Sequence, residues 1–141
     1  MDSGTSGGAT ADGARARVLT EHPLPASGQV LVVYAGGNDG GMRWALRPDG
    51  PAPVALVGEP VAARFVAHAR VHGRAFVALG ALGAPAEPPA VTLRVRRRLG
   101  PSRQVSVTPA VVAGLLWVVE HAGDVVEVEV VAEGVRETRQ L

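Results

Sequence analysis

Short runs of alternating apolar and polar residues extend from Ala14 to Ala132, and glycine or proline interrupts these runs about every ten residues. In the segment 125–132, for example, valines alternate with Glu127 and Glu129. A period of two directs one set of side chains to a buried face of a strand and the other set to water. The pattern therefore predicts an all-β fold. The spacing of the turns predicts an antiparallel β-sandwich of about eight to ten strands, with jelly-roll or immunoglobulin-like architecture.

The expected strands lie between these interruptions. Their predicted bounds, in chain order, are 14–20, 29–34, 42–47, 54–57, 63–72, 75–82, 91–98, 103–108, 115–120 and 125–132. The segment 60–72 is ambiguous, because Pro60 and Gly73 also suit the two ends of a helix. A strand places both of its histidines and two arginines on one side and most apolar side chains on the other. We favour the strand.

Composition limits the class of protein. The chain has 141 residues, of which 47% are hydrophobic and 19% charged, and its net charge is +1. This apolar content excludes a wholly disordered chain and is sufficient for the core of one domain. Residues 1–13 are rich in Gly, Ser, Thr and Ala, which predicts a flexible tail before a single domain at 14–141. All 14 basic residues are arginine and isoleucine is absent, a bias typical of a high-GC bacterial genome.

Other absences exclude particular chemistries and compartments. Cysteine is absent, which excludes disulfides and thiolate metal sites. The first residues lack the basic start and the apolar stretch of a signal peptide. The longest strongly apolar run, 110–119, is about half the length of a membrane-spanning helix. We therefore expect a cytoplasmic protein that makes no contact with a membrane.

Charge is distributed unevenly along the chain. Residues 61–103 hold eight arginines and one acidic residue, whereas residues 120–141 hold six acidic residues and two arginines. The basic part predicts a sheet face that binds phosphate or carboxylate groups through guanidinium forks. The residues of this predicted anion-binding face are Arg64, His68, Arg70, His72, Arg94, Arg96 and Arg98. The alternative is that Arg94 and Arg96 pair with Glu127 and Glu129 on a neighbouring strand.

Nucleic acid is disfavoured as the partner, because aromatic residues that would stack on bases all lie in apolar-face patterns. His68 and His72 are expected about 13 Å apart on a strand, too far to share a metal ion, so a solvated polar face is predicted. The segment 36–41 has neither the lysine nor the following helix of a phosphate-binding loop, and it predicts a long hairpin turn. We expect no metal and no cofactor.

The segment 120–124 is a further candidate for chemistry. A histidine beside carboxylates, here His121, suits acid–base catalysis. Its place between two valine-rich strands favours a hairpin turn instead. A small hydrolase or isomerase built around His121 stays open as a third alternative, but no residue is assigned as catalytic.

Two of the predicted strands are apolar on both faces. The segment 75–86 carries no charge, and residues 115–119 are apolar throughout. Since a strand in a sandwich turns one face to the core, its other face must be covered by another part of the chain or by a protein partner. The predicted interface residues are Phe76, Val77, Leu79, Leu82, Leu116 and Val118.

These observations favour a non-enzymatic binding or assembly module. It would associate with a protein partner or a second copy through its apolar strand faces, and its complementary basic and acidic regions would set the orientation. The alternative is a domain that binds an anionic small molecule or a glycan on the Arg/His sheet face. A structural or interaction role is thus predicted.

Overall fold

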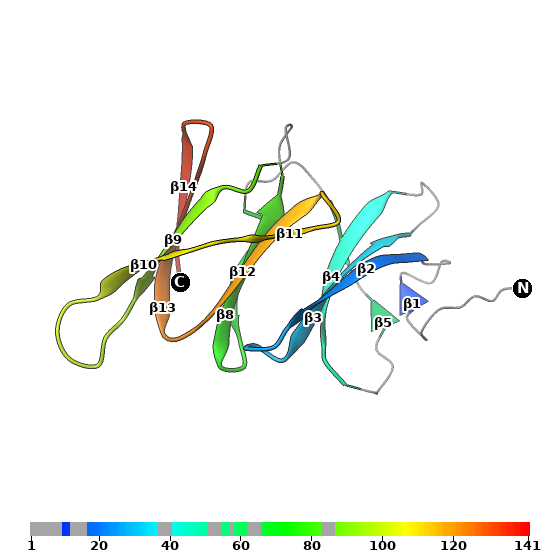
Figure 1. Cartoon of the computed structure of the whole chain (residues 1–141). Coiled ribbons are helices and arrows are strands. Elements are labelled where there is room, and N and C mark those ends of the chain that lie inside the picture. The colour runs from blue at the N-terminus through cyan, green and yellow to red at the C-terminus, as the bar shows by residue number, and fades with distance from the viewer. Residues whose placement is uncertain are drawn as a thin grey trace, which may run out of the picture. The chain divides into compact units, whose positions relative to one another are not determined.

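The computed structural model describes residues 10–11, 17–36, 41–50, 55–56, 58–61, 66–82 and 87–141, and none of these residues lies in a helix. They form three four-stranded antiparallel sheets and one two-stranded parallel pair (Figure 1). The predicted all-β fold is confirmed. The chain divides into two compact units, Met1–Val61 and Ala62–Leu141. Within the described residues, no helix is long and apolar enough to cross a membrane.

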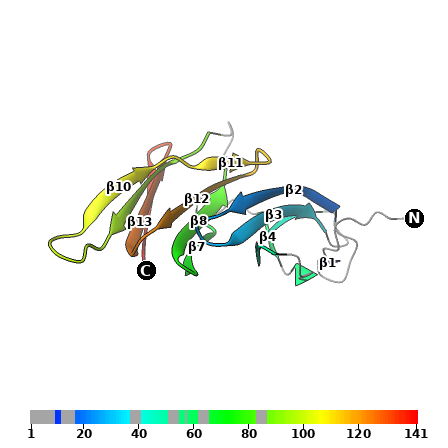
Figure 2. The same ribbon diagram turned by 60° about the horizontal axis from the view of Figure 1, so that its bottom comes forward.

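The first unit contains one four-stranded sheet and the parallel pair. The pair joins β1 (Thr10–Ala11) to β5 (Ala55–Leu56), and apart from β1 the predicted tail at 1–13 lies outside the described residues. In the sheet, β2, β3 and β4 lie side by side (Figure 2). The short strand β6 pairs with the other side of β4. The bounds are β2 (Arg17–Leu24), β3 (Gln29–Ala35), β4 (Met42–Pro48) and β6 (Glu59–Pro60).

The segment 36–41 joins β3 to β4, which pair antiparallel, as predicted for a hairpin. The Gly36 N–H donates to the Gly41 carbonyl at 3.2 Å, although residues 37–40 lie outside the described residues.

The core of the first unit lies against one face of β3. Val30, Val32 and Tyr34 alternate along this strand and form a buried cluster with Ala45 of β4. Gly58 packs against the Tyr34 ring and the backbone carbonyl of Trp44, where there is no room for a Cβ atom. The close approach explains why glycine is needed at a position just before β6.

We expect Gly58→Ala to lower the free energy of unfolding by about 2–3 kcal/mol, because overpacked sites cost energy of this order. The new Cβ would overlap the Tyr34 hydroxyl and lie 2.5 Å from the Trp44 carbonyl oxygen. Urea unfolding followed by tryptophan fluorescence measures the change. Gly134→Ala is the control: it has open space and a φ of 78°, so only backbone strain of about 1 kcal/mol is expected. Equal losses in the two variants would contradict the close approach.

The second unit contains the other two sheets. The strand orders are β10-β9-β13-β14 and β11-β12-β8-β7. The bounds in the first of these sheets are β9 (Ala90–Val95), β10 (Arg103–Val107), β13 (Val125–Ala132) and β14 (Val135–Gln140). Those in the second are β7 (His68–His72), β8 (Ala75–Ala81), β11 (Ala110–Val112) and β12 (Leu116–Ala122).

Both sheets of the second unit contribute side chains to one hydrophobic cluster. Its largest members are Trp117 of β12 and Phe76 of β8, which are fully buried. Alternate residues of β9 and three valines of β13 also belong to the cluster, and Val66 contributes from the segment before β7. In β13 the period of two holds from Val128, because the pairing with β9 shifts register between Val125 and Glu127. The period of two in these strands therefore selects the side chains that reach the core.

Arg139 connects the two sheets at one edge. It lies on β14, the edge strand of one sheet, and its Nη2 donates to the carbonyl oxygen of Val66 at 2.7 Å. Val66 precedes β7, the edge strand of the other sheet. A second contact, to Glu137 at 3.0 Å, orients the guanidinium. A single side chain thus ties β14 to the chain leading into β7.

Two hairpins of the second unit use residues with positive φ that are not glycine. Ala113 has a φ of 55° between β11 and β12, and Glu133 has a φ of 52° between β13 and β14. In both turns the next residue is a glycine with positive φ. Two successive positive φ angles match the right-handed twist of a hairpin, but they strain an alanine.

Replacing Ala113 by Asn should raise the free energy of unfolding by about 0.5–1 kcal/mol, since Asn tolerates the left-handed region better than Ala. Thermal or urea unfolding measures the gain. As a control, Ala122→Asn introduces the same side chain at another exposed position, where the backbone φ is not positive. A gain of the same size there would show that the effect is not conformational.

The path of the chain differs from the sequence prediction at residues 120–124. A hairpin was expected, but β12 and β13 belong to different sheets, so the chain crosses between the sheets at this point. Turn-forming residues indicate where a strand ends and do not specify the partner of the next strand. Val125 pairs with Val95 of β9, and Arg96 donates its N–H to the Asp124 carbonyl at 2.8 Å.

The described residues form fourteen strands, more than the eight to ten predicted. Four of the strands, β1, β5, β6 and β11, have only two or three residues, too few to show a period. The last strand, β14, is long but mostly polar, and its pairing with β13 makes it a strand. At 60–72 the strand interpretation is confirmed for His68–His72, and residues 62–65 lie outside the described residues.

Candidate functional site

The residues of the predicted anion-binding face fall into two groups in the second unit. His68, Arg70 and His72 lie on β7, whereas Arg94 lies on β9 in the other sheet. The β7 group is opposite Leu79, Val77 and Ala75 of β8, on the face that points away from the hydrophobic cluster. Arg94 is opposite Glu127 on the outward face of its own sheet. Arg64 lies outside the described residues.

Arg94 makes the ion pair that was the alternative to anion binding. Its Nη2 lies 3.7 Å from a Glu127 carboxylate oxygen. Arg96 pairs with Asp124 at 3.8 Å and not with Glu129, because β9 ends at Val95 and Arg96 lies beside the start of β13. Glu129 pairs instead with Arg136 of β14 at 3.5 Å. The outward face of this sheet is therefore a set of charge pairs.

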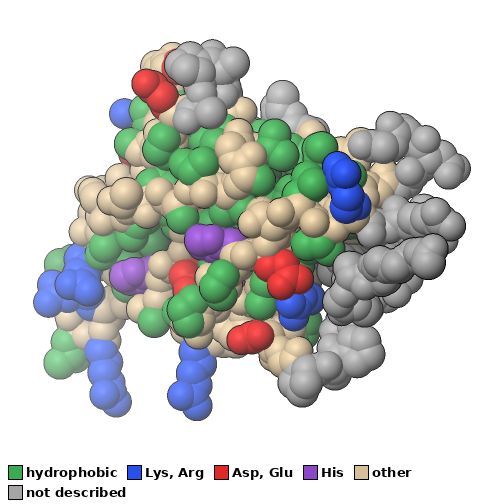
Figure 3. All heavy atoms as spheres, turned by 45° about the vertical axis from the view of Figure 1, so that its right-hand side comes forward, with side chains coloured by type: hydrophobic (Ala, Val, Ile, Leu, Met, Phe, Trp, Pro, Cys, Tyr) green, Lys and Arg blue, Asp and Glu red, His purple; other side chains and the backbone are tan. Residues whose placement is uncertain are grey.

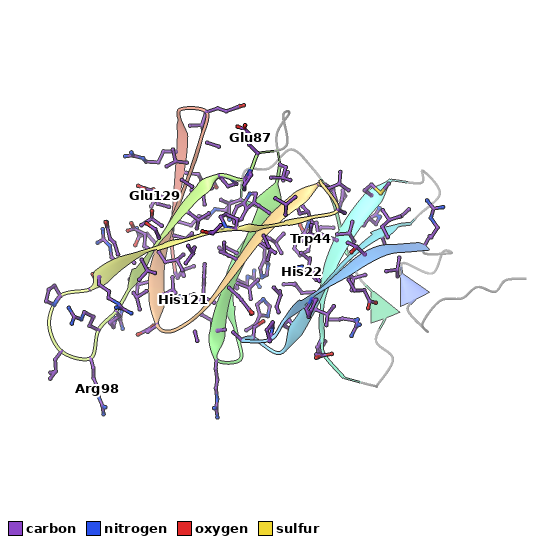
Figure 4. The ribbon with its side chains drawn as sticks, viewed as in Figure 1. His22, Trp44, Glu87, Arg98, His121 and Glu129 are labelled. Carbon is purple, nitrogen blue, oxygen red and sulfur yellow. The ribbon has the colours of Figure 1, made fainter. Side chains whose placement is uncertain are left out.

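A different basic surface lies where β9 turns into β10. We call residues 96–103, which include the first residue of β10, the basic loop; it contains Arg96, Arg97, Arg98 and Arg103, and every one of its residues is exposed. Among the described residues, no acidic side chain forms an ion pair with Arg97, Arg98 or Arg103. Figure 4 shows Arg98 directed away from the strands at the end of the sheet.

Leu99 is the most exposed large apolar side chain of the described chain, with 85% of its surface accessible. It follows three consecutive arginines and precedes Gly100 and Pro101. The sequence pattern predicted strong positive charge between residues 61 and 103, and it predicted residues 99–102 only as the connection between two strands. The sequence did not show that β9 ends at Val95, so that Arg96, Arg97 and Arg98 lie in an exposed loop after the strand.

The acidic residues of the C-terminal strands do not leave a matching negative surface. Glu127 contacts both Arg94 and Gln140, and Glu137 pairs with Arg139. Asp124 and Glu129 have the arginine partners described above. Figure 3 shows one face of the molecule, on which several Arg side chains extend from the surface. Apart from Glu133 in the β13–β14 hairpin, the described charges of this sheet that form no ion pair are therefore arginines of the basic loop.

His68 and His72 form a close pair on β7. Their Nε2 atoms are 2.8 Å apart and their ring centroids 5.0 Å apart, with 25° between the ring planes. The centroid separation exceeds the nitrogen separation by about the width of one ring, so the rings meet end to end. The expectation that these histidines are too far apart to share an ion is wrong, because both side chains extend along the strand toward each other.

Both histidines have a lowered pKa. Burial, then the charge of His72 and then that of Arg70 lower the pKa of His68 to about 4 from 6.5. Burial and then Arg70 lower the pKa of His72. Besides Arg70, the described strands of this sheet place one charged side chain on the same face, Glu120 of β12, which is opposite Val77. Near neutral pH, the pair therefore shares one N–H···N hydrogen bond between two uncharged rings.

Five of the six predicted interface residues are buried, and Leu82 is partly buried. Phe76 belongs to the hydrophobic cluster of the second unit, and Leu82 packs against it. The other four are buried on the opposite face of the β8–β12 pair: Val77, Leu79, Leu116 and Val118. His121, the centre of the enzymatic alternative, lies on β12 opposite Phe76 (Figure 4).

Comparison with known proteins adds no family to this description: no family model, no curated protein and no solved structure matches the chain.

With EDTA present, the free energy of unfolding should fall by about 1–2 kcal/mol as the pH falls from 6.5 toward 4. This is less than the energy equivalent of the whole pKa shift of His68, because the His68 ring is partly exposed to water. The folded-state pKa of His68 lies below the unfolded-state value, so in this window the unfolded state binds more protons and acid favours unfolding. Urea unfolding at several pH values measures the slope.

His68→Gln should flatten this pH dependence, because glutamine does not titrate. His121→Gln removes a histidine from a different strand and should retain the slope. An unchanged slope in His68→Gln would assign the acid sensitivity to other groups.

Proposed function

We propose that this chain is a non-enzymatic binding module that recognises an anionic partner through the basic loop. The observation that carries this proposal is the exposed set of arginines at 96–103, three of which form no ion pair with the acidic residues described. Guanidinium groups bind phosphate and carboxylate groups through paired hydrogen bonds. Because the loop lies at the ends of β9 and β10 and all its residues are exposed, its donors are accessible to a partner larger than the loop itself.

The second unit supports the proposal of a β-sandwich as the scaffold of this loop. Two four-stranded sheets contribute to one cluster, and Arg139 connects them at an edge. A rigid scaffold with a variable loop at its end is a common arrangement for binding proteins. Jelly-roll and immunoglobulin-like topologies both stay as predictions.

Charge balance favours the basic loop over the sheet face proposed from sequence. Arg94 and Arg96 each have a carboxylate within 4 Å, at Glu127 and Asp124. An anion at that face would compete with these carboxylates, whereas at Arg97 and Arg98 it would meet cations that lack such a partner among the described side chains. A partner bearing several phosphate, sulfate or carboxylate groups fits a row of arginines best.

Assembly through the apolar strand faces is a weaker proposal than anion binding. The buried side chains at Val77, Leu79, Leu116 and Val118 would have to be uncovered before they touched a second molecule. Uncovering apolar side chains costs about 25 cal/mol for each Å² exposed. We therefore assign the primary contact to the basic loop.

We expect the double variant Arg97→Ser/Arg98→Ser to weaken binding of a fluorescein-labelled heparin fragment at least tenfold in low salt. Two lost guanidinium contacts correspond to about 1.4 kcal/mol or more. Fluorescence anisotropy titration measures the dissociation constant.

The matched control is Arg17→Ser/Arg74→Ser, which removes the same charge from two other exposed positions. It should change the affinity less than threefold. Equal weakening by the two double variants would mean that net charge alone attracts the probe, and no binding by the wild type would overturn the proposal. Far-ultraviolet circular dichroism of each variant checks that the fold is retained.

A further inference from the structure

The His68–His72 pair presents two ring nitrogens at one point on the surface of an edge strand. The two Nε2 atoms are 2.8 Å apart, and both side chains are only partly buried. In the uncharged pair, one Nε2 carries a hydrogen and the other offers a lone pair to it. Two imidazole nitrogens this close together are also a donor set that late transition metals prefer.

From this geometry we propose that His68 and His72 form a binding site for a divalent transition-metal ion such as Zn²⁺. A metal bound to both Nε2 atoms needs a nitrogen separation of about 3.0–3.4 Å, for bonds near 2.1 Å at right or tetrahedral angles. The observed separation is 2.8 Å, so the two nitrogens must move apart by less than about 1 Å. Because they face each other in the hydrogen-bonded pair, each ring must also turn by about 35–45° to aim its lone pair at the ion. Rotation of the two side chains on an edge strand accommodates such a change.

Metal binding changes the tautomer of one ring. Both Nε2 lone pairs must face the metal, so both rings must carry their hydrogen on Nδ1. The ring that donates in the free pair therefore moves its proton from Nε2 to Nδ1 by exchange with water. No proton is released overall and no redox partner is needed, because both rings are uncharged before and after the step.

The charge beside the pair limits its affinity for a cation. Arg70 lies between the histidines in sequence, and its charge opposes a cation, but its side chain is exposed and therefore screened by water. Within the described chain, no group of three or more His, Cys, Asp or Glu side chains could hold a metal. The described chain thus offers the two histidines as ligands, and water or a further ligand completes the coordination.

The test uses the whole chain and ZnCl₂ as the only ligand. Isothermal titration should show one Zn²⁺ ion bound per chain, and His68→Gln or His72→Gln should each weaken binding at least tenfold. His22→Gln and His121→Gln are the matched controls, since they remove the two other histidines (Figure 4), and each should change the affinity less than twofold. MgCl₂ should not bind, because imidazole is a poor ligand for hard cations.

A second measurement keeps the proposal falsifiable if a variant fails to fold. Nitrogen-15 NMR of histidine-labelled wild-type protein should show the Nε2 resonances of two histidines shifting together on addition of ZnCl₂, with one ring changing tautomer. Absence of Zn²⁺ binding, or equal weakening by His121→Gln and His72→Gln, would overturn the assignment. Since neither measurement involves the basic loop, the outcome is independent of anion binding there.

Discussion

The burial of Trp117 and Phe76 among valines from two sheets is the interaction on which the second unit depends. Both side chains are fully inaccessible to water, and they lie on neighbouring strands of one sheet while β9 and β13 supply the valines of the other. Large aromatic side chains dominate the energetics of such a core. The alternation along β9 and β13 then determines which of their side chains face outward, including Arg94, Glu127 and Glu129.

Local pattern in the sequence was sufficient to predict most of the long strands, because a period of two is a property of neighbouring residues. It was insufficient where the outcome depended on distant partners. The segment 120–124 has the composition of a hairpin turn, yet Val125 continues into a different sheet and pairs with Val95. β14 has no apolar period, and hydrogen bonds to β13 define it. Pairing partners are a property of the whole chain, and turn residues do not encode them.

The candidate sites show the same division between local and global information. The count of arginines at 61–103 located positive charge correctly, but only the strand register distinguishes Arg94, which is beside Glu127, from Arg97 and Arg98 in the loop. For the histidines, the error lay in treating Cα spacing as the distance between functional atoms. Long side chains directed along a strand can meet across four residues, and backbone periodicity does not report their reach.

The contact between Arg139 and Val66 has an asymmetric consequence for sequence change. The acceptor is a backbone oxygen, which every amino acid possesses, so replacing Val66 would alter the hydrophobic cluster without removing the acceptor. The donor belongs to a side chain, and a shorter residue at 139 could not reach across from β14. The hydrogen bond thus tolerates substitution at position 66 but not at position 139. The connection between the two sheet edges therefore depends on the identity of one residue, Arg139.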